Sequence, residues 1–338
     1  MSRCGRSIPV LAAAAALMLA ACDAPTPTTP RALAPAFDES GDGGGDFAVG
    51  PRWIFETRDA AARHDATSAT STNGINYHGG RVLAYATNVA AIYWGTSPVY
   101  YGGPTPGTTG AGSADGSLVG FFLRNLGGSP YFGINTTYYN AAGGHVANTV
   151  SYTRYWANNS YQVPSGSVSI SDEQMVAMLQ YAFNNGKLTY NMNTLYAIFT
   201  PGKVNLGGGF GTQYCAYHNW ATVTVAGVSK TVLYAAMPYD DAYPSACTAG
   251  LKSPNGMPAA DAEVNTLAHE TEETSTDPIG TGWWDARGYE NADKCAWTFG
   301  ATYTTPNGGT ANMSLGGKNF LVQRNWVNAG GGYCALHL

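Results

Sequence analysis

The chain contains little charge and no concentration of positive charge. Only 12% of its 338 residues are charged, and 22 acidic residues stand against 17 basic ones, a formal net charge of −5. Nucleic-acid-binding domains need a run or stripe of lysine and arginine to neutralise phosphates, and the sequence has none. We therefore expect no nucleic-acid partner.

The chain also lacks an apolar run long enough to span a bilayer near its start. The run Ile8 to Ala21 follows a basic segment and is shorter than the roughly 20 residues of a spanning helix. Its end, Leu19-Ala20-Ala21-Cys22, is typical of a bacterial lipoprotein signal, in which Cys22 is lipidated. We predict a signal peptide at residues 1–21 and membrane contact only through this lipid anchor. The protein would face outside the cytoplasm in the cell envelope; the alternative, an ordinary secretory signal, makes it secreted.

Residues 22–49 offer almost nothing that a core could bury. They begin with Pro-Thr repeats and end in a glycine-rich stretch, which predicts a disordered tether. The folded part would then be residues 50–338, a single domain of a length that is ordinary for a large α/β fold.

Cysteine pairs with the C-x-x-C spacing of zinc sites are absent. Cys4 leaves with the signal peptide, so four cysteines remain besides Cys22: Cys215, Cys247, Cys295 and Cys334. An even number in an exported protein favours two disulfides, for which three connectivities are possible. We favour Cys215–Cys247 and Cys295–Cys334, since each closes a local module of about 30 to 40 residues.

Nucleotide-binding features are absent as well. The glycine-rich stretch Gly207 to Gly211 has neither the lysine of a P-loop nor the following helix of a dinucleotide fingerprint. We interpret it as a surface loop.

What the chain does contain is an alternation of apolar strands and amphipathic helices. Val89–Trp94 and Thr194–Phe199 are continuous apolar runs typical of buried strands. Helical spacing covers 116–127, and Ser171 with Gln174 predicts a capped helix start. Further extended segments are expected at 129–139, 146–155 and 318–326, and a hairpin around Gly227. The pattern predicts an α/β fold with a mixed, largely buried sheet flanked by helices, with hairpin additions and two disulfides.

A predicted helix from Pro258 to Thr276 carries the most informative motif. Its apolar stripe runs through Val264 and Leu267, and His269 and Glu273 stand one turn apart on the opposite face, with Glu270 on the flank. This resembles the H-E-x-x-H helix of metallohydrolases, which supplies two metal ligands and a general base. Here glutamate replaces the second histidine, giving H-E-x-x-E.

A third ligand is expected after this helix, which Asp277-Pro278 ends. Glu290 lies seventeen residues beyond Glu273, a separation at which a glutamate can complete such a site. Secondary candidates are His78, Asp285 and Asp293. The alternative is a structural calcium site, because carboxylate oxygens suit that cation.

Several segments resemble the EXORDIUM/phosphate-induced protein family. They are Tyr77-His78-Gly79-Gly80, Asp277-Pro278, Glu290 to Cys295, Phe320 to Gln323 and Cys334-Ala335-Leu336. The family is known in plants as secreted cell-wall proteins linked to growth, without an assigned reaction. The resemblance implies a bacterial branch that retains the H-E-x-x-E helix, which the plant pattern lacks.

Two functions follow as hypotheses. The first is an exported zinc metallopeptidase-like hydrolase, with His269, Glu273 and Glu290 on the metal and Glu270 as the base. His218 or Tyr217 would stabilise the oxyanion, the substrate would be a peptide or a cell-envelope polymer, and we expect a monomer.

The second hypothesis is a non-catalytic cell-envelope or glycan-binding protein. Trp283, Trp284 and Trp297 would stack on sugar rings, and the acidic cluster would form a structural calcium site.

Overall fold

The computed structural model describes residues 47–67, 74–161 and 169–338. The predicted signal peptide, the lipidation site Cys22 and most of the predicted tether lie outside these ranges. Within them, no helix combines the length and the apolar character that crossing a membrane requires. The first described residues contact the sheet, since the amide of Thr222 donates to the carbonyl of Ala48 over 2.8 Å.

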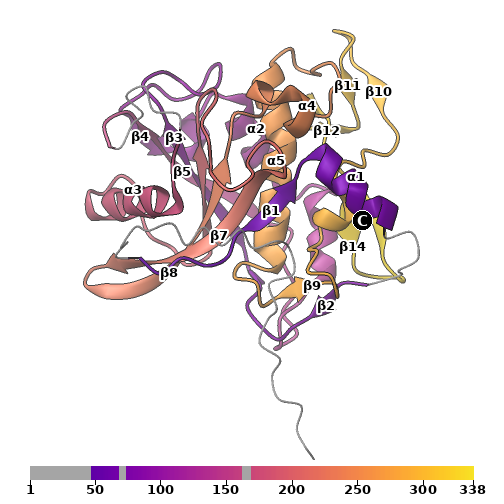
Figure 1. The fold of residues 1–338 in the computed structure, drawn as a ribbon, viewed down its shortest axis with the longest axis horizontal. Coiled ribbons are helices and arrows are strands. Elements are labelled where there is room, and N and C mark those ends of the chain that lie inside the picture. Colours follow the sequence, from indigo (N-terminus) through magenta and orange to yellow (C-terminus); the bar gives the residue numbers. More distant parts are fainter. Residues whose placement is uncertain (1–46, 68–73, 162–168) are drawn as a thin grey trace, which may run out of the picture. The chain divides into compact units, whose positions relative to one another are not determined.

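A seven-stranded mixed sheet is the central layer of the fold (Figure 1). In spatial order its strands are β1 (Trp53–Glu56), β7 (Tyr214–Val225), β8 (Val228–Met237), β6 (Thr194–Phe199), β3 (Thr87–Trp94), β5 (Val150–Asn158) and β4 (Thr109–Ala111). The four strands from β8 to β5 run parallel, while β1, β7 and β4 join antiparallel. The predicted mixed sheet is confirmed, with both predicted apolar strands at its parallel centre.

Helices cover both faces of this sheet. α2 (Leu118–Leu126) and α5 (Pro258–Thr276) share one apolar core with the sheet, and α3 (Asp172–Asn184) shares the other. Alternate strand residues enter the two cores, as Phe199 and Ile198 do. Because both faces are covered, the central strands are apolar throughout, which explains why they are evident in the sequence.

The predicted helix boundaries and the hairpin are also confirmed. Ser171 and Gln174 form the expected capping box at the start of α3, and Asp277 caps the end of α5. The β7–β8 hairpin closes through Ala226 and Gly227, which both have positive φ, as a two-residue turn requires.

Two predictions of extended structure are wrong in detail. Residues 129–139 were predicted to be extended, yet they contain the 3-10 helix η2 (Phe132–Thr137), because the hydroxyl of Ser129 accepts from the amide of Phe132 and favours a turn. The predicted strand 318–326 is two short strands, β13 (Lys318–Phe320) and β14 (Asn325–Val327).

The remaining elements surround the sheet and include most of the C-terminal segment. They are α1 (Arg58–Thr67), β2 (Asn76–Tyr77), η1 (Gly112–Ala114), η3 (Asp240–Ala242), α4 (Pro244–Cys247), β9 (Trp283–Trp284), η4 (Asp293–Cys295), β10 (Tyr303–Thr304), β11 (Thr310–Ala311), β12 (Met313–Leu315) and β15 (Tyr333–Ala335). The favoured disulfides are both present: Cys215–Cys247 joins β7 to α4, and Cys295–Cys334 joins η4 to β15.

Candidate metal centre

His218 lies on the face of β7 that points toward α5. Side chains alternate along a strand, so its neighbour Tyr217 points to the opposite face, where its hydroxyl donates to Asp172 over 2.8 Å. Of the two candidates for oxyanion stabilisation, only His218 reaches the carboxylates of α5. Its ring is 1% exposed and stacks on the indole of Trp53 from β1, with ring centroids 5.6 Å apart.

The polar face of α5 is buried as fully as its apolar stripe. His269, Glu270 and Glu273 are each 0% exposed. The sequence suggested that these side chains would stand on the open face of the helix. The structure differs because the C-terminal segment packs over this face, with Gln323 and Asn325 in hydrogen-bond contact with residues of α5.

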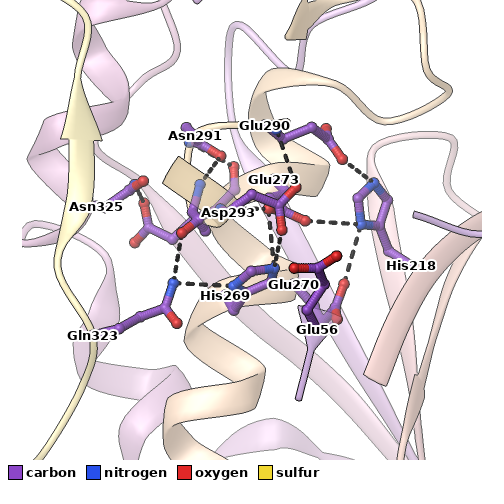
Figure 2. Close-up of polar contacts among 12 residues, drawn as sticks. Glu56, His218, His269, Glu270, Glu273, Glu290, Asn291, Asp293, Gln323 and Asn325 are labelled. Carbon is purple, nitrogen blue, oxygen red and sulfur yellow. Dashed lines mark hydrogen bonds and ion pairs between the residues drawn. The ribbon is translucent and has the colours of Figure 1, made fainter. Parts of the chain in front are cut away.

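One side of the buried site is organised around His218 (Figure 2). Its Nδ1 lies 3.1 Å from Oε2 of Glu270 and 3.6 Å from Oε2 of Glu273. Its Nε2 lies 3.6 Å from Oε2 of Glu290, which comes from the loop after β9.

The other side is organised around His269. Its Nε2 lies 3.0 Å from Oε1 of Glu273 and 3.5 Å from Oδ1 of Asp293. Its Nδ1 lies 3.0 Å from Nε2 of Gln323, which also donates to the carbonyl of Ala292 over 2.9 Å.

In the part of the chain that the structure describes, two groups of side chains are therefore close enough to hold a metal ion. We call them the His218 set (His218, Glu273 and Glu290) and the His269 set (His269, Glu273 and Asp293). In each set, one ligand atom from every residue lies within 4.8 Å of the others. The sequence grouped Glu290 with His269, whereas the structure brings Glu290 to His218 and gives His269 the secondary candidate Asp293. Glu273 belongs to both sets.

Many of these buried polar atoms lack a hydrogen bond. Among the described residues, no partner exists for Nε2 of His218, Nε2 of His269, Oε1 of Glu270, Oε2 of Glu273 or either carboxylate oxygen of Glu290. A buried polar atom without a partner costs about 1–3 kcal/mol, and more when it is charged. A divalent cation would satisfy several of these atoms at once, so the side chains present fit a metal ion.

Burial also shifts the pKa values of the residues in this site. It raises the pKa of Glu273 to about 7 and raises the pKa values of Glu270 and Glu290 well above the usual glutamate value. Burial, together with the charge on His269, lowers the pKa of His218 to about 3. His218 is thus neutral near pH 7, the form that binds metals.

The pKa of His269 shifts in the opposite direction from that of His218. Burial alone would lower its pKa, but the charge of Glu273 and the contacts with Asp293 and Glu273 raise the pKa of His269 well above its ordinary value. Without a metal ion, His269 therefore favours the positively charged form, in contact with Glu273 and Asp293.

Two secondary candidates lie away from both sets. His78 is exposed, stacks on Trp284 with ring centroids 3.3 Å apart and contacts the Trp284 carbonyl. Asp285 is buried, but its carboxylate contacts Arg287 at 3.3 Å and Lys294 at 3.2 Å. Neither residue forms, with other described residues, a group that could hold a metal ion.

Sequence reasoning missed two residues that reach this region. Gln323 sits on the segment between β13 and β14 and contacts His269. Glu56, at the end of edge strand β1, is 6% exposed and extends toward Glu270 of α5 (Figure 2). Gln323 ends the resemblance segment Phe320 to Gln323, which gave it no site role, and Glu56 belongs to no motif. The packing of distant segments brings both residues to α5.

A family model described as the phosphate-induced protein 1 conserved region matches residues 128–321, more than half of the chain. The chain belongs to the phosphate-induced protein family. The matched range contains His218, α5, Glu290 and Asp293, so both metal sets lie within the family region, and Gln323 lies just beyond it. No curated protein and no solved structure matches the chain.

Proposed function

We propose that the protein is an exported, metal-dependent hydrolase whose centre is the His218 set. The carboxylate of Glu290 is the observation that carries this proposal. It is 1% exposed, neither of its oxygens has a hydrogen-bond partner in the described part of the chain, and it faces the equally unpartnered Nε2 of His218 at 3.6 Å. A cation between these atoms would offset the cost of burying them.

The residues present give each group a role. His218, Glu273 and Glu290 would hold the ion, and the imidazole favours zinc over calcium because calcium takes oxygen ligands. When bound, the ion would act as a Lewis acid toward a carbonyl and toward water. Glu270 contacts Nδ1 of His218 through Oε2, and its unpartnered Oε1 is the atom that would take a proton from water.

The substrate class follows from the proposed export of the chain. Anchored through Cys22 or secreted, the protein would meet peptides or cell-envelope polymers. The centre is almost fully buried, so β1 and the loop 277–293 would have to admit the substrate. Trp53 of β1, which stacks on His218, is the side chain that a substrate would displace first.

The test is metal analysis together with hydrolysis by the purified full chain. We expect bound zinc in the wild type and in Glu270→Gln, with at least a roughly 100-fold loss of peptide or envelope-polymer hydrolysis in the variant, because a missing general base typically costs that much. Equal hydrolysis by the variant and the wild type would overturn the role of Glu270. Absence of bound metal would overturn the centre itself.

One observation favours a second candidate, a structural cation site in a non-catalytic envelope protein. Structural metal sites are closed, and every residue of the His218 set is at most 1% exposed. Trp283 has little surface to offer a sugar, since it is 3% exposed and its indole donates to the Tyr139 carbonyl. Trp284 and Trp297 are partly exposed and remain the candidates for stacking.

This candidate has its own test. Removal of the ion would lower the melting temperature, and no tested polymer would be hydrolysed. Polysaccharide retention that survives His269→Ala would support it, and loss of retention in that variant would count against it.

A further inference from the structure

We infer that the centre holds two divalent cations bridged by the carboxylate of Glu273, one in the His218 set and one in the His269 set. This inference rests on the proposed metal centre and extends it from one ion to two.

The two oxygens of Glu273 face different histidines. Oε2 lies 3.6 Å from Nδ1 of His218, and Oε1 lies 3.0 Å from Nε2 of His269. The amide of Asp293 donates to Oε1 over 3.1 Å and so helps to fix the direction of the carboxylate. A carboxylate that presents one oxygen to each of two ligand groups has the geometry of a bridge.

One short loop supplies a separate carboxylate to each side of this bridge. Glu290 approaches His218, and Asp293, three residues later, approaches His269 (Figure 2). The loop is held together locally, because the amide of Glu290 donates to Oδ2 of Asp293 over 3.1 Å. Each side therefore has its own histidine and its own acid, and shares only Glu273.

The His269 set has the contacts of an ion pair without its hydrogen bonds. Nε2 of His269 lies close to the oxygens of Glu273 and Asp293, yet it is not aligned for a hydrogen bond with any described residue. The ring is 0% exposed and packs on Phe55, with centroids 4.1 Å apart, so Nε2 is shielded from bulk solvent. An ion among these three side chains would accept the lone pair of Nε2 and both carboxylates.

The two sites differ in how ready their histidines are to bind a metal ion. Glu270 contacts Nδ1 of His218, an arrangement that orients a ligating imidazole and raises its basicity. Nε2 is then left for a metal, and although Oε2 of Glu273 lies 3.6 Å from Nδ1, one Glu273 oxygen is within 4.8 Å of the other ligand atoms of the set. At His269, the amide nitrogen of Gln323 already donates to Ala292 and faces Nδ1, so Nδ1 has no acceptor for the proton that it carries when Nε2 binds a metal. Binding at that atom requires the Gln323 amide to turn, so the His269 site fills second.

A bridged pair would change what the centre can do. Two-metal sites hold the attacking and the leaving oxygens of a hydrolytic reaction at the same time. The proposal therefore assigns Asp293 and His269 to the same reacting centre as His218, and gives Gln323 the role of a positioning residue.

The test uses the metal-stripped full chain titrated with Mn²⁺, followed by calorimetry and electron paramagnetic resonance. We expect two Mn²⁺ per chain in two steps, with an exchange-coupled spectrum after the second. Asp293→Asn, at a partly exposed position, should bind one Mn²⁺ with an uncoupled spectrum, as should His269→Ala. Glu272→Gln, a neighbouring buried glutamate outside both sets, is the matched control and should keep both ions.

The position of Gln323 gives a second readout. Gln323→Glu offers Nδ1 an acceptor, so we expect the second Mn²⁺ to bind about tenfold more tightly, the lower end of typical outer-shell effects. One Mn²⁺ per chain in the wild type, or two ions without magnetic coupling, would overturn the bridge but leave the His218 site intact. Absence of Mn²⁺ binding would overturn the bridge and the proposed function together.

Discussion

At the scale of single residues, the buried carboxylate of Glu290 is the most informative group. Burial raises its pKa, and neighbouring acids raise it further, with Glu273 first among them. An acid in this position either stays protonated or binds a cation. The choice between these states can be measured.

We predict that Glu290→Gln lowers zinc affinity by at least about 100-fold, because losing even an outer-shell partner typically costs 10–100-fold. The substitution keeps the shape of the side chain and removes its charge. Competition with a zinc-binding dye measures the effect. The control is again Glu272→Gln, whose carboxylate contacts Asn135 and Asn325 instead of the histidines. Equal losses in the two variants would contradict a ligand role for Glu290.

At the scale of elements, edge strand β1 covers the ring of His218 with Trp53. β1 pairs only with β7 in the sheet, where Trp53 aligns with His218. Its indole also packs closely on Gly280, where an added Cβ would lie 1.9 Å from the ring. Trp53 therefore closes the space between the sheet and the loop that follows α5.

We predict that Trp53→Ala increases the rate at which a chelator removes zinc, because the variant uncovers the ring of His218. Stopped-flow release into a chromogenic chelator measures this rate. Trp53→Phe is the matched control, since it keeps an aromatic ring on His218 and should stay close to the wild type. Identical rates in all three proteins would show that ions reach the centre by another route.

At the scale of the whole molecule, the disulfides tie the site to the periphery. Cys295–Cys334 joins η4, which begins with Asp293, to the C-terminal strand β15 and closes a separation of 39 residues. Cys215–Cys247 closes a similar separation of 32 residues and joins β7, three positions before His218, to α4. The two bridges thus anchor opposite sides of the centre.

We predict that Cys295→Ser/Cys334→Ser lowers the free energy of unfolding by about 3–4 kcal/mol, the loss expected for loops of this length. It should also weaken Mn²⁺ binding at the His269 set, because η4 loses its anchor. Urea unfolding and Mn²⁺ titration measure both effects. The matched variant Cys215→Ser/Cys247→Ser should lose similar stability without a selective effect at His269. An unchanged urea midpoint in the first variant would refute the prediction.

A second prediction at this scale concerns pH. Asp240 lies under α5, where its Oδ2 accepts from the hydroxyl of Thr266, and Glu263 and Asp241 are its acidic neighbours. Burial raises the pKa of Asp240 from 3.8 to about 8, so the folded state keeps a proton that the unfolded chain releases. Below pH 3.8 both states are protonated and stability is unaffected. Between pH 3.8 and about 8, stability falls as pH rises.

Asp240→Asn removes this titration and keeps an acceptor for Thr266. We expect the unfolding free energy of the variant, relative to that of the wild type, to increase progressively from pH 4 to pH 8. Urea unfolding at several pH values measures this difference. A difference that stays constant with pH would contradict the shift.

Elements whose signals are local can be predicted from the amino-acid sequence. The bounds of α5, the capping box of α3, the β7–β8 turn and the central apolar strands all depend on residues near one another in the chain. The disulfide pairing was also accessible, because short separations are favoured. The family resemblance rested on short motifs, and the family match confirmed it.

The assembly of the site depends mainly on contacts between distant segments of the chain. His269 and Glu273 meet because a helix places them one turn apart, which spacing alone reveals. The contact of Glu290 with His218, the approach of Gln323 to His269 and the burial of the polar face of α5 join segments far apart in the chain. Such contacts depend on how whole layers pack, and no local pattern encodes which distant side chain a layer brings to a given atom.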